Sequence, residues 1–261
     1  SLISCHKRVF FENKYTLKEN NDSILLKIGA NSINHSTCLQ YFVSNDSDYL
    51  SLLSRDCKTI EIYNLNTSKL IKEIKLYAEG PNFFPPIFGY VIKNLDTVLA
   101  IGIAPQMIGI LNTNGEVLKR ISYEKDINGV VNNPSFAYLG NRPFIIGDSL
   151  QIIPAFRADE SAGILTETKQ RHSPVNVSIN LKTGLCKSSK LTIPSDLVNM
   201  DITGIETSRE IGYNNVYVYH YSLIDSLYIT YDHLKFEKIP IETNYKLSLK
   251  ENMYNNINNM Y

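Results

Sequence analysis

An excess of charge of one sign is missing from this sequence of 261 residues. Lysine plus arginine and aspartate plus glutamate both number 26, which argues against a nucleic-acid binder, because such proteins usually carry a basic excess. Long apolar runs are missing too. The longest, Val98–Leu111, is broken by Pro105 and Gln106 and is too short for a transmembrane helix. No long segment of the chain keeps apolar residues at helical spacing, so no strong helix is predicted.

Cysteine is sparse, and local motifs for catalysis or metal binding are absent from the sequence. Cys5, Cys38, Cys57 and Cys186 are too few for a disulfide scaffold, and we expect Cys38 and Cys57 to be buried free thiols. There is no Gly-rich phosphate loop, Cys-x-x-Cys, His-Glu-x-x-His, Gly-x-Ser-x-Gly or EF-hand loop. The five histidines are scattered, so neither a metal site nor a cofactor is predicted.

Residues that favour strands are abundant. The chain has 17 Tyr, 10 Phe and many Val and Ile. Short apolar runs, separated by turns rich in Asn, Asp, Ser and Gly, fall into four sets of four predicted strands. The sets are Leu39–Ser44, Tyr49–Leu53, Thr59–Asn64 and Lys69–Leu76; Ile87–Lys93, Thr97–Gly102, Met107–Leu111 and Glu116–Ser122; Ser135–Leu139, Phe144–Gly147, Val175–Leu181 and Cys186–Ile193; and Ser208–Tyr213, Val216–Tyr221, Leu227–Tyr231 and Lys235–Ile239. Two further strand-like runs, Lys14–Leu17 and Ile24–Ile28, precede the first set, and Tyr245–Leu249 follows the last.

The third strands of the sets give the repeat length. Ile62, Ile110, Ile179 and Ile229 hold equivalent places, separated by 48, 69 and 50 residues. The longest interval contains the polar stretch Arg157–Ser173, which we interpret as an insertion between the second and third strands of the third set. Repeats of about 40–50 residues with four strands each are typical of a β-propeller. The competing all-β folds are a sandwich and a barrel, which do not explain the regular grouping by four.

The N-terminus resembles a lipidation signal. Leu2-Ile3-Ser4-Cys5 fits the pattern of aliphatic and small residues before the cysteine that receives lipid in bacterial lipoproteins. The basic and apolar regions that precede such a site are absent here, and an ordinary terminal cysteine is the alternative. Acylation of Cys5 would anchor a domain to a membrane without spanning it.

A family resemblance rests on the run from Tyr49 to Lys93. Its successive pieces Thr59–Leu65, Lys72–Leu76, Glu79–Asn82 and Phe88–Ile92 resemble six-bladed β-propeller proteins of unknown function from Bacteroidetes, many of which are lipoproteins. The resemblance implies an extracytoplasmic address, in the periplasm or anchored to the outer membrane, and a binding role without known catalytic residues.

Family members are longer than this chain, in which four complete blades can be read. The chain is therefore predicted to form an all-β propeller that is a truncated or incomplete six-bladed ring. We assign residues 1–13 to a tether and 14–261 to one propeller domain.

Candidate site residues come from two loops. Glu79-Gly80-Pro81-Asn82 joins the outer strand of the first blade to the inner strand of the second, and we expect Glu79 and Asn82 to project toward the central axis; a rigid turn is the alternative. The insertion offers Arg157, Arg171 and His172 for an anionic or sugar ligand, with a solvated loop as the alternative. An acid/base pair of Glu79 with Glu160 is a further guess.

Two functions follow from these features. The first is a non-enzymatic binding module that takes a carbohydrate, peptide or protein on one face of the propeller. The second is a carbohydrate-active hydrolase or lyase that draws its acid and base from separate blades, because such a site leaves no local motif.

Overall fold

The computed structural model describes residues 23–28, 38–54, 56–102, 104–123, 134–135, 137, 139–154, 174–194, 207–212, 216–221 and 224–241. Within these ranges the chain forms strands β1 to β16 and one short 3-10 helix, η1 (Leu139–Asn141). No helix among the described residues has the length and apolarity needed to cross a membrane.

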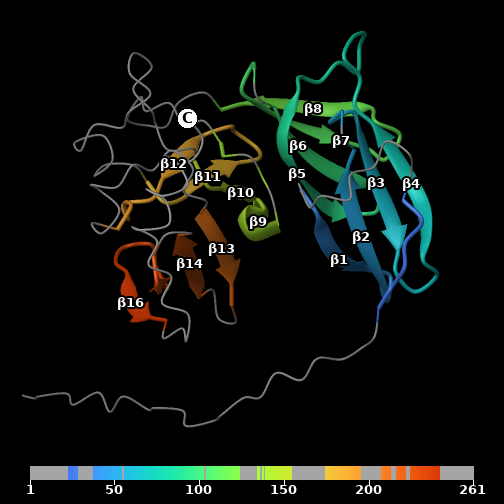
Figure 1. Ribbon diagram of the computed structural model, residues 1–261. Helices are drawn as coiled ribbons and strands as arrows, with labels where there is room; N and C mark the ends of the chain where they lie inside the picture. The colour runs from blue at the N-terminus through green and yellow to red at the C-terminus, as the bar shows by residue number, and fades with distance from the viewer. Residues whose placement is uncertain are drawn as a thin grey trace, which may run out of the picture.

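The strands form four sheets, each an antiparallel meander of four strands in chain order (Figure 1). Sheet one contains β1 (Gln40–Ser44), β2 (Ser47–Leu53), β3 (Thr59–Asn64) and β4 (Lys69–Lys75); sheet two contains β5 (Ile87–Asn94), β6 (Thr97–Gly102), β7 (Met107–Leu111) and β8 (Val117–Ser122); sheet three contains β9 (Phe144–Ile146), β10 (Ser149–Ile152), β11 (Val177–Asn180) and β12 (Cys186–Ser188); and sheet four contains β13 (Thr207–Ile211), β14 (Tyr217–Tyr221), β15 (Ser226–Thr230) and β16 (Glu237–Pro240).

The first strands of the sheets meet at the centre, which makes the sheets the blades of a β-propeller. β1 packs against β5, β5 against β9, and η1, just ahead of β9, against β13. The last strands β4, β8 and β16 face outward with mostly exposed side chains. The predicted all-β propeller of four-stranded antiparallel blades is therefore confirmed, while its completion to a six-bladed ring stays a prediction. Ile62, Ile110, Ile179 and Ile229 do lie in the third strand of each sheet.

Sheet three differs from the prediction by one strand. The described residues of Ser135–Leu139, predicted as its first strand, are not in a strand: Pro134 makes an isolated bridge with Pro154, and η1 begins at Leu139. The first strand is instead β9, and β10 is the second. The insertion still lies between the second and third strands, as predicted. The strand expected at Ile24–Ile28 is wrong, because those residues are not in a strand.

Apolar clusters between neighbouring sheets hold the blades together. One cluster joins sheets one and two, a second joins sheets two and three, and a third joins sheets three and four. Strand β6 contributes to two of them: Val98 and Ala100 belong to the first cluster, and Leu99 and Ile101 to the second. This double burial explains why the strand has no polar face. Each large apolar side chain buried in this way contributes about 1.5–3 kcal/mol.

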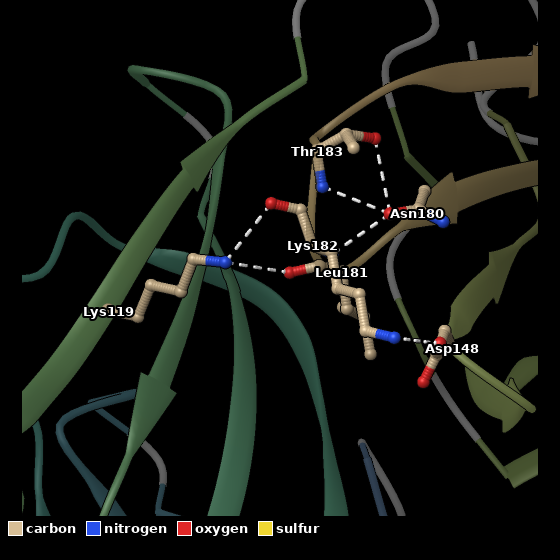
Figure 2. A network of polar contacts seen from close by, with 6 residues as sticks. All are labelled: Lys119, Asp148, Asn180, Leu181, Lys182 and Thr183. Atoms are coloured by element: carbon tan, nitrogen blue, oxygen red, sulfur yellow. Dashed lines mark hydrogen bonds and ion pairs between the residues drawn. The ribbon is translucent and has the colours of Figure 1, made fainter.

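The outer parts of sheets two and three are joined by polar contacts. Lys119 Nζ, on β8, donates to the carbonyl oxygens of Leu181 (3.1 Å) and Lys182 (3.2 Å) in the β11–β12 hairpin (Figure 2). Asn180 Oδ1 accepts the backbone N–H groups of Lys182 and Thr183 and so fixes the turn that presents these carbonyls. Lys182 also donates to Asp148, and this hydrogen bond holds the pKa of the carboxyl below its ordinary value.

The described cysteines are free thiols in different surroundings. Cys38 and Cys186 are buried, whereas Cys57 is exposed, so the prediction of a buried thiol is confirmed for Cys38 and wrong for Cys57. Burial raises the pKa of Cys38 to about 12, and its Sγ donates to the carbonyl of Ala137 (2.9 Å). A thiol held protonated in this way is a packing group and not a nucleophile.

Candidate functional site

A cavity of about 320 Å³ lies where the first strands of all four sheets meet. We call it the axial cavity. Its lining consists of Gln40–Phe42 on β1, Val91–Lys93 on β5, Arg142–Ile145 at the start of β9, and Arg209–Ile211 on β13. Each sheet therefore contributes a short run of neighbouring residues.

Gln40 closes one wall of the axial cavity. Strand β5 pairs with β6 along one edge only, so the backbone groups on its other edge need partners. The Gln40 side-chain amide supplies them: Nε2 donates to the Tyr90 carbonyl, and Oε1 accepts from Ile92 N (3.3 Å). Beside it, Phe42 stacks on Tyr49 with ring centroids 5.2 Å apart. These hydrogen bonds join β1 to β5 along this wall.

Arg209 is a buried cation in the cavity lining, with only 2% of its surface exposed. Its Nη1 donates to Asn176 Oδ1 (2.5 Å), and Nη2 donates to the carbonyls of Arg142 (3.3 Å) and Gln151 (3.4 Å). Its Cζ lies 4.4 Å from the Phe144 ring centroid, a cation–π contact. All of these partners are neutral, and Nε has no acceptor among the described residues. Burial lowers the pKa of the guanidinium, which is the direction expected for a charge taken out of water.

Three more charged side chains line the axial cavity. Lys93 and Glu210 are exposed. Arg142 Nη2 lies 3.9 Å from Glu210 Oε2, with 42% and 61% of the two side chains exposed. An ion pair at this distance, between side chains this exposed to solvent, contributes little to stability. The lining thus carries three cations and one carboxylate, and the remainder of it is largely apolar.

Comparison with known proteins places this architecture in a family. The family described as "Domain of unknown function (DUF4221)" matches residues 14–259 of the chain. The chain belongs to the DUF4221 family. This confirms the predicted resemblance to a β-propeller family of unknown function.

A solved DUF4221 member from Bacteroides vulgatus aligns with this DUF4221 chain with a TM-score of 0.71 at 18% identity, over 84% of this chain and 62% of that one. The DUF4221 chain therefore spans less than two thirds of that relative. A candidate exported protein from Bacteroides fragilis aligns with a TM-score of 0.48 at 11% identity, over 88% of this chain and 58% of that one. Virginiamycin B lyase from Staphylococcus aureus gives 0.43 at 13%, over 82% and 73%. Likenesses as distant as the last two say nothing about function. No curated protein matches the chain in sequence.

The predicted turn of the DUF4221 chain lies away from the axial cavity. It does connect β4 to β5, and Gly80 has the positive φ (80°) that the turn requires. However, Asn82 Oδ1 accepts from Val117 N (3.2 Å) on β8, the outermost strand of sheet two. Glu79 is exposed, and neither side chain lines the cavity. The expectation that Glu79 and Asn82 project toward the axis is therefore wrong, while any role of theirs in binding stays a prediction.

The other predicted site residues lie outside the described residues. These are Cys5, Arg157, Glu160, Arg171 and His172. Their roles stay predictions. Nowhere in the described part of the chain do three His, Cys, Asp or Glu side chains gather as metal ligands do.

Sequence reasoning missed every residue that lines the axial cavity. Arg209 gave no usable signal, because its neighbours on the strand are Ser208 and Glu210 and arginine is almost never fully buried unless it is paired. Gln40, Lys93 and Arg142 gave none, because single polar residues at strand ends are common.

Proposed function

We propose that this DUF4221 chain is a binding module whose ligand occupies the axial cavity. The observation that carries the proposal is the convergence of four sheets on one cavity of about 320 Å³. Small-molecule sites measure about 300–1,000 Å³, so the cavity fits a small molecule or one end of a larger carbohydrate, peptide or protein. The ordered wall formed by Gln40 supports a pocket that exists before the ligand arrives.

The same cavity favours binding over hydrolysis. Glycoside hydrolysis generally uses two carboxyl groups that flank the scissile bond. Among the described lining residues, Glu210 is the only carboxylate. This supports a non-enzymatic role over a carbohydrate-active hydrolase; a lyase stays the alternative.

A matched pair of isoleucines tests the cavity. Ile211 on β13 lines it and is 39% exposed; Ile239 on β16, in the same sheet, is 41% exposed and lies outside it. Tryptophan at position 211 fills part of the cavity, so we expect Ile211→Trp to abolish the thermal shift given by ligands from a panel of glycans and cell-envelope peptides. The Ile239→Trp variant should respond like wild type.

Two outcomes would contradict the proposal. Ligands that stabilise Ile211→Trp as strongly as wild type would move the site elsewhere on the molecule. Turnover of any glycan in the panel, read as released reducing ends, would replace binding with catalysis.

We also propose an extracytoplasmic location with lipid anchoring at Cys5. The support is the pattern Leu2-Ile3-Ser4-Cys5, which fits a lipidation signal. Labelled palmitate, supplied to a bacterium that makes the full-length protein, should enter the wild type and not a Cys5→Ala variant. Equal labelling of both would rule out acylation at this cysteine.

A further inference from the structure

We infer that the axial cavity selects ligands that carry an anionic group, a carboxylate or a phosphate, which binds among Lys93, Arg142 and Arg209. This inference rests on the proposed function and names the ligand class for the same site.

Charge is segregated into the cavity. The chain as a whole is balanced, with 26 basic and 26 acidic residues. The cavity lining, in contrast, holds three cations and one carboxylate. A concave site with an excess of one sign and apolar walls concentrates its field and attracts ions of the opposite sign. An anion is therefore the ligand that this distribution favours.

Arg209 gives the cavity a permanent positive charge, which the neighbouring Tyr219 and the charge of Glu210 compensate only in part. An arginine stays protonated in proteins, and its guanidinium has five N–H donors. Here the bonded acceptors are an amide and two backbone carbonyls, Nε is unpartnered, and no Asp or Glu of the described residues forms an ion pair with it. A buried cation without a counter-ion is costly. An anion in the adjoining cavity would offset part of that cost.

The Arg142 guanidinium is available to bind the anion. Its backbone carbonyl accepts from Arg209, so the two arginines are neighbours, yet its own guanidinium is paired only loosely with Glu210. A ligand carboxylate or phosphate can accept two parallel N–H bonds from arginine, which is better geometry than the single 3.9 Å approach of Glu210. Glu210 is thus an internal competitor that an anionic ligand displaces.

The test compares two probes of the same shape and different charge. Benzoate and its neutral counterpart benzamide are titrated at constant ionic strength and followed by NMR chemical shifts, with inorganic phosphate as a third probe. We expect benzoate or phosphate to bind and benzamide to bind at least about tenfold more weakly, as the loss of one charge-assisted hydrogen bond predicts. Binding of one anion without the other separates a carboxylate site from a phosphate site.

Three exposed positions and the half-buried Arg142 supply the variants. Arg142→Gln and Lys93→Gln should each weaken anion binding, the arginine variant by about tenfold. Glu210→Gln should strengthen it, because the competitor is removed. Lys69→Gln is the control: Lys69 is an exposed lysine on β4, far from the axis, and its loss should change nothing. Arg209 is left intact, because it also ties sheets three and four together.

The outcomes separate the two proposals. Equal binding of benzoate and benzamide, no binding of either anion, or an effect of Lys69→Gln as large as that of Arg142→Gln would overturn the inference. The binding-module proposal would survive this if a neutral ligand still bound wild type and not Ile211→Trp. Conversely, anions that bind Ile211→Trp as well as wild type would show that the cavity is not the site.

Discussion

At the junction of sheets three and four, polar side chains are buried and bonded to one another. Arg209 bonds to Asn176, whose Nδ2 donates to Gln151 Oε1 (2.8 Å). Tyr219, the partner of Arg209 on the neighbouring strand β14, has its hydroxyl 3.1 Å from His233 Nε2. Buried polar groups are stable only when their partners are in place, so this network accepts one alignment of the two sheets. It therefore positions β13, and with it one wall of the axial cavity.

His233 makes this junction sensitive to pH. Burial, and then the positive charge of Arg209, lower the pKa of His233 from 6.5 to about 4. Between these values the unfolded chain binds a proton that the folded chain does not, so stability is complete above about pH 6.5 and is lost as the pH falls toward 4. A protonated ring also cannot accept the hydrogen of the Tyr219 hydroxyl at Nε2.

We expect His233→Asn to flatten this pH dependence. Asparagine tolerates the positive φ of this position (55°), so the backbone is not strained. The measurement is the urea midpoint of both proteins at neutral pH and at about pH 5, where the wild type should have lost more stability than the variant. Parallel losses would show that the acid sensitivity arises from groups other than His233.

The hairpin between third and fourth strands is the recurring element of the fold. In three sheets it begins with an asparagine whose Oδ1 accepts backbone N–H groups of the turn: Asn64 from Thr67 (2.9 Å), Asn112 from Glu116 (3.0 Å) and Asn180 from Thr183 (3.0 Å). In sheets two and three the hairpin also packs against the last strand of the preceding sheet. The same turn therefore connects two strands of its own blade and holds that blade against its neighbour.

A comparison of two glycines distinguishes the strain of the turn itself from the contact of the hairpin with the preceding sheet. Gly115, in the β7–β8 hairpin, and Gly80 have nearly the same φ, 82° and 80°. A Cβ at Gly115 would lie 2.2 Å from the Lys75 carbonyl oxygen of sheet one, whereas a Cβ at Gly80 would meet nothing within 4 Å. Gly80→Ala should lower the free energy of unfolding by about 1–2 kcal/mol through backbone strain alone. Gly115→Ala should lower it by about 1–3 kcal/mol more, because the sheets must move apart.

Urea denaturation of the two variants beside wild type measures the difference. Equal losses of unfolding free energy would mean that the hairpin does not pack against sheet one in solution. A larger loss for Gly115→Ala would establish the hairpin as a docking contact.

Elements bounded by strong turns could be predicted from the sequence. Strands β3, β6 and β7 match their predicted limits, because turn residues such as Asn94 before β6 and Asn112 after β7 bound these short apolar or alternating runs. The strand assignment predicted for sheet three was displaced by one strand, because β9 has only three residues and the turn after it, Gly147-Asp148, lies at the end of an apolar run. A strand that short leaves too little periodicity to tell it from the end of its neighbour.

At the scale of the molecule, the site could not be predicted, because it exists only after four distant segments have met. Its lining comes from β1, β5, β9 and β13, and no two of these are neighbours in the chain. The blade order explains why such a site leaves no local motif: each first strand supplies a few residues and the packing of the sheets brings them together. The same order suggests how stability is distributed.

The three apolar clusters form a row, since each joins one sheet to the next. In architectures of this kind a repeat responds mainly to its nearest neighbours. Leu99 on β6 is 1% exposed in the cluster between sheets two and three, whereas Leu118 on β8 of the same sheet is 62% exposed. Leu99→Ala should lower the free energy of unfolding by about 2–5 kcal/mol, and Leu118→Ala should change it by less than about 0.5 kcal/mol.

Native-state hydrogen exchange resolves where that loss is felt. For Leu99→Ala, amides of β6 and β10, on either side of the damaged cluster, should lose most protection, and amides of β14 in sheet four should lose less, because the cluster between sheets three and four is intact. An equal loss in all four sheets would instead show that the blades open as one cooperative unit. In that case the axial cavity would be as rigid as the cores of the blades, and a ligand bound there would stabilise every sheet equally.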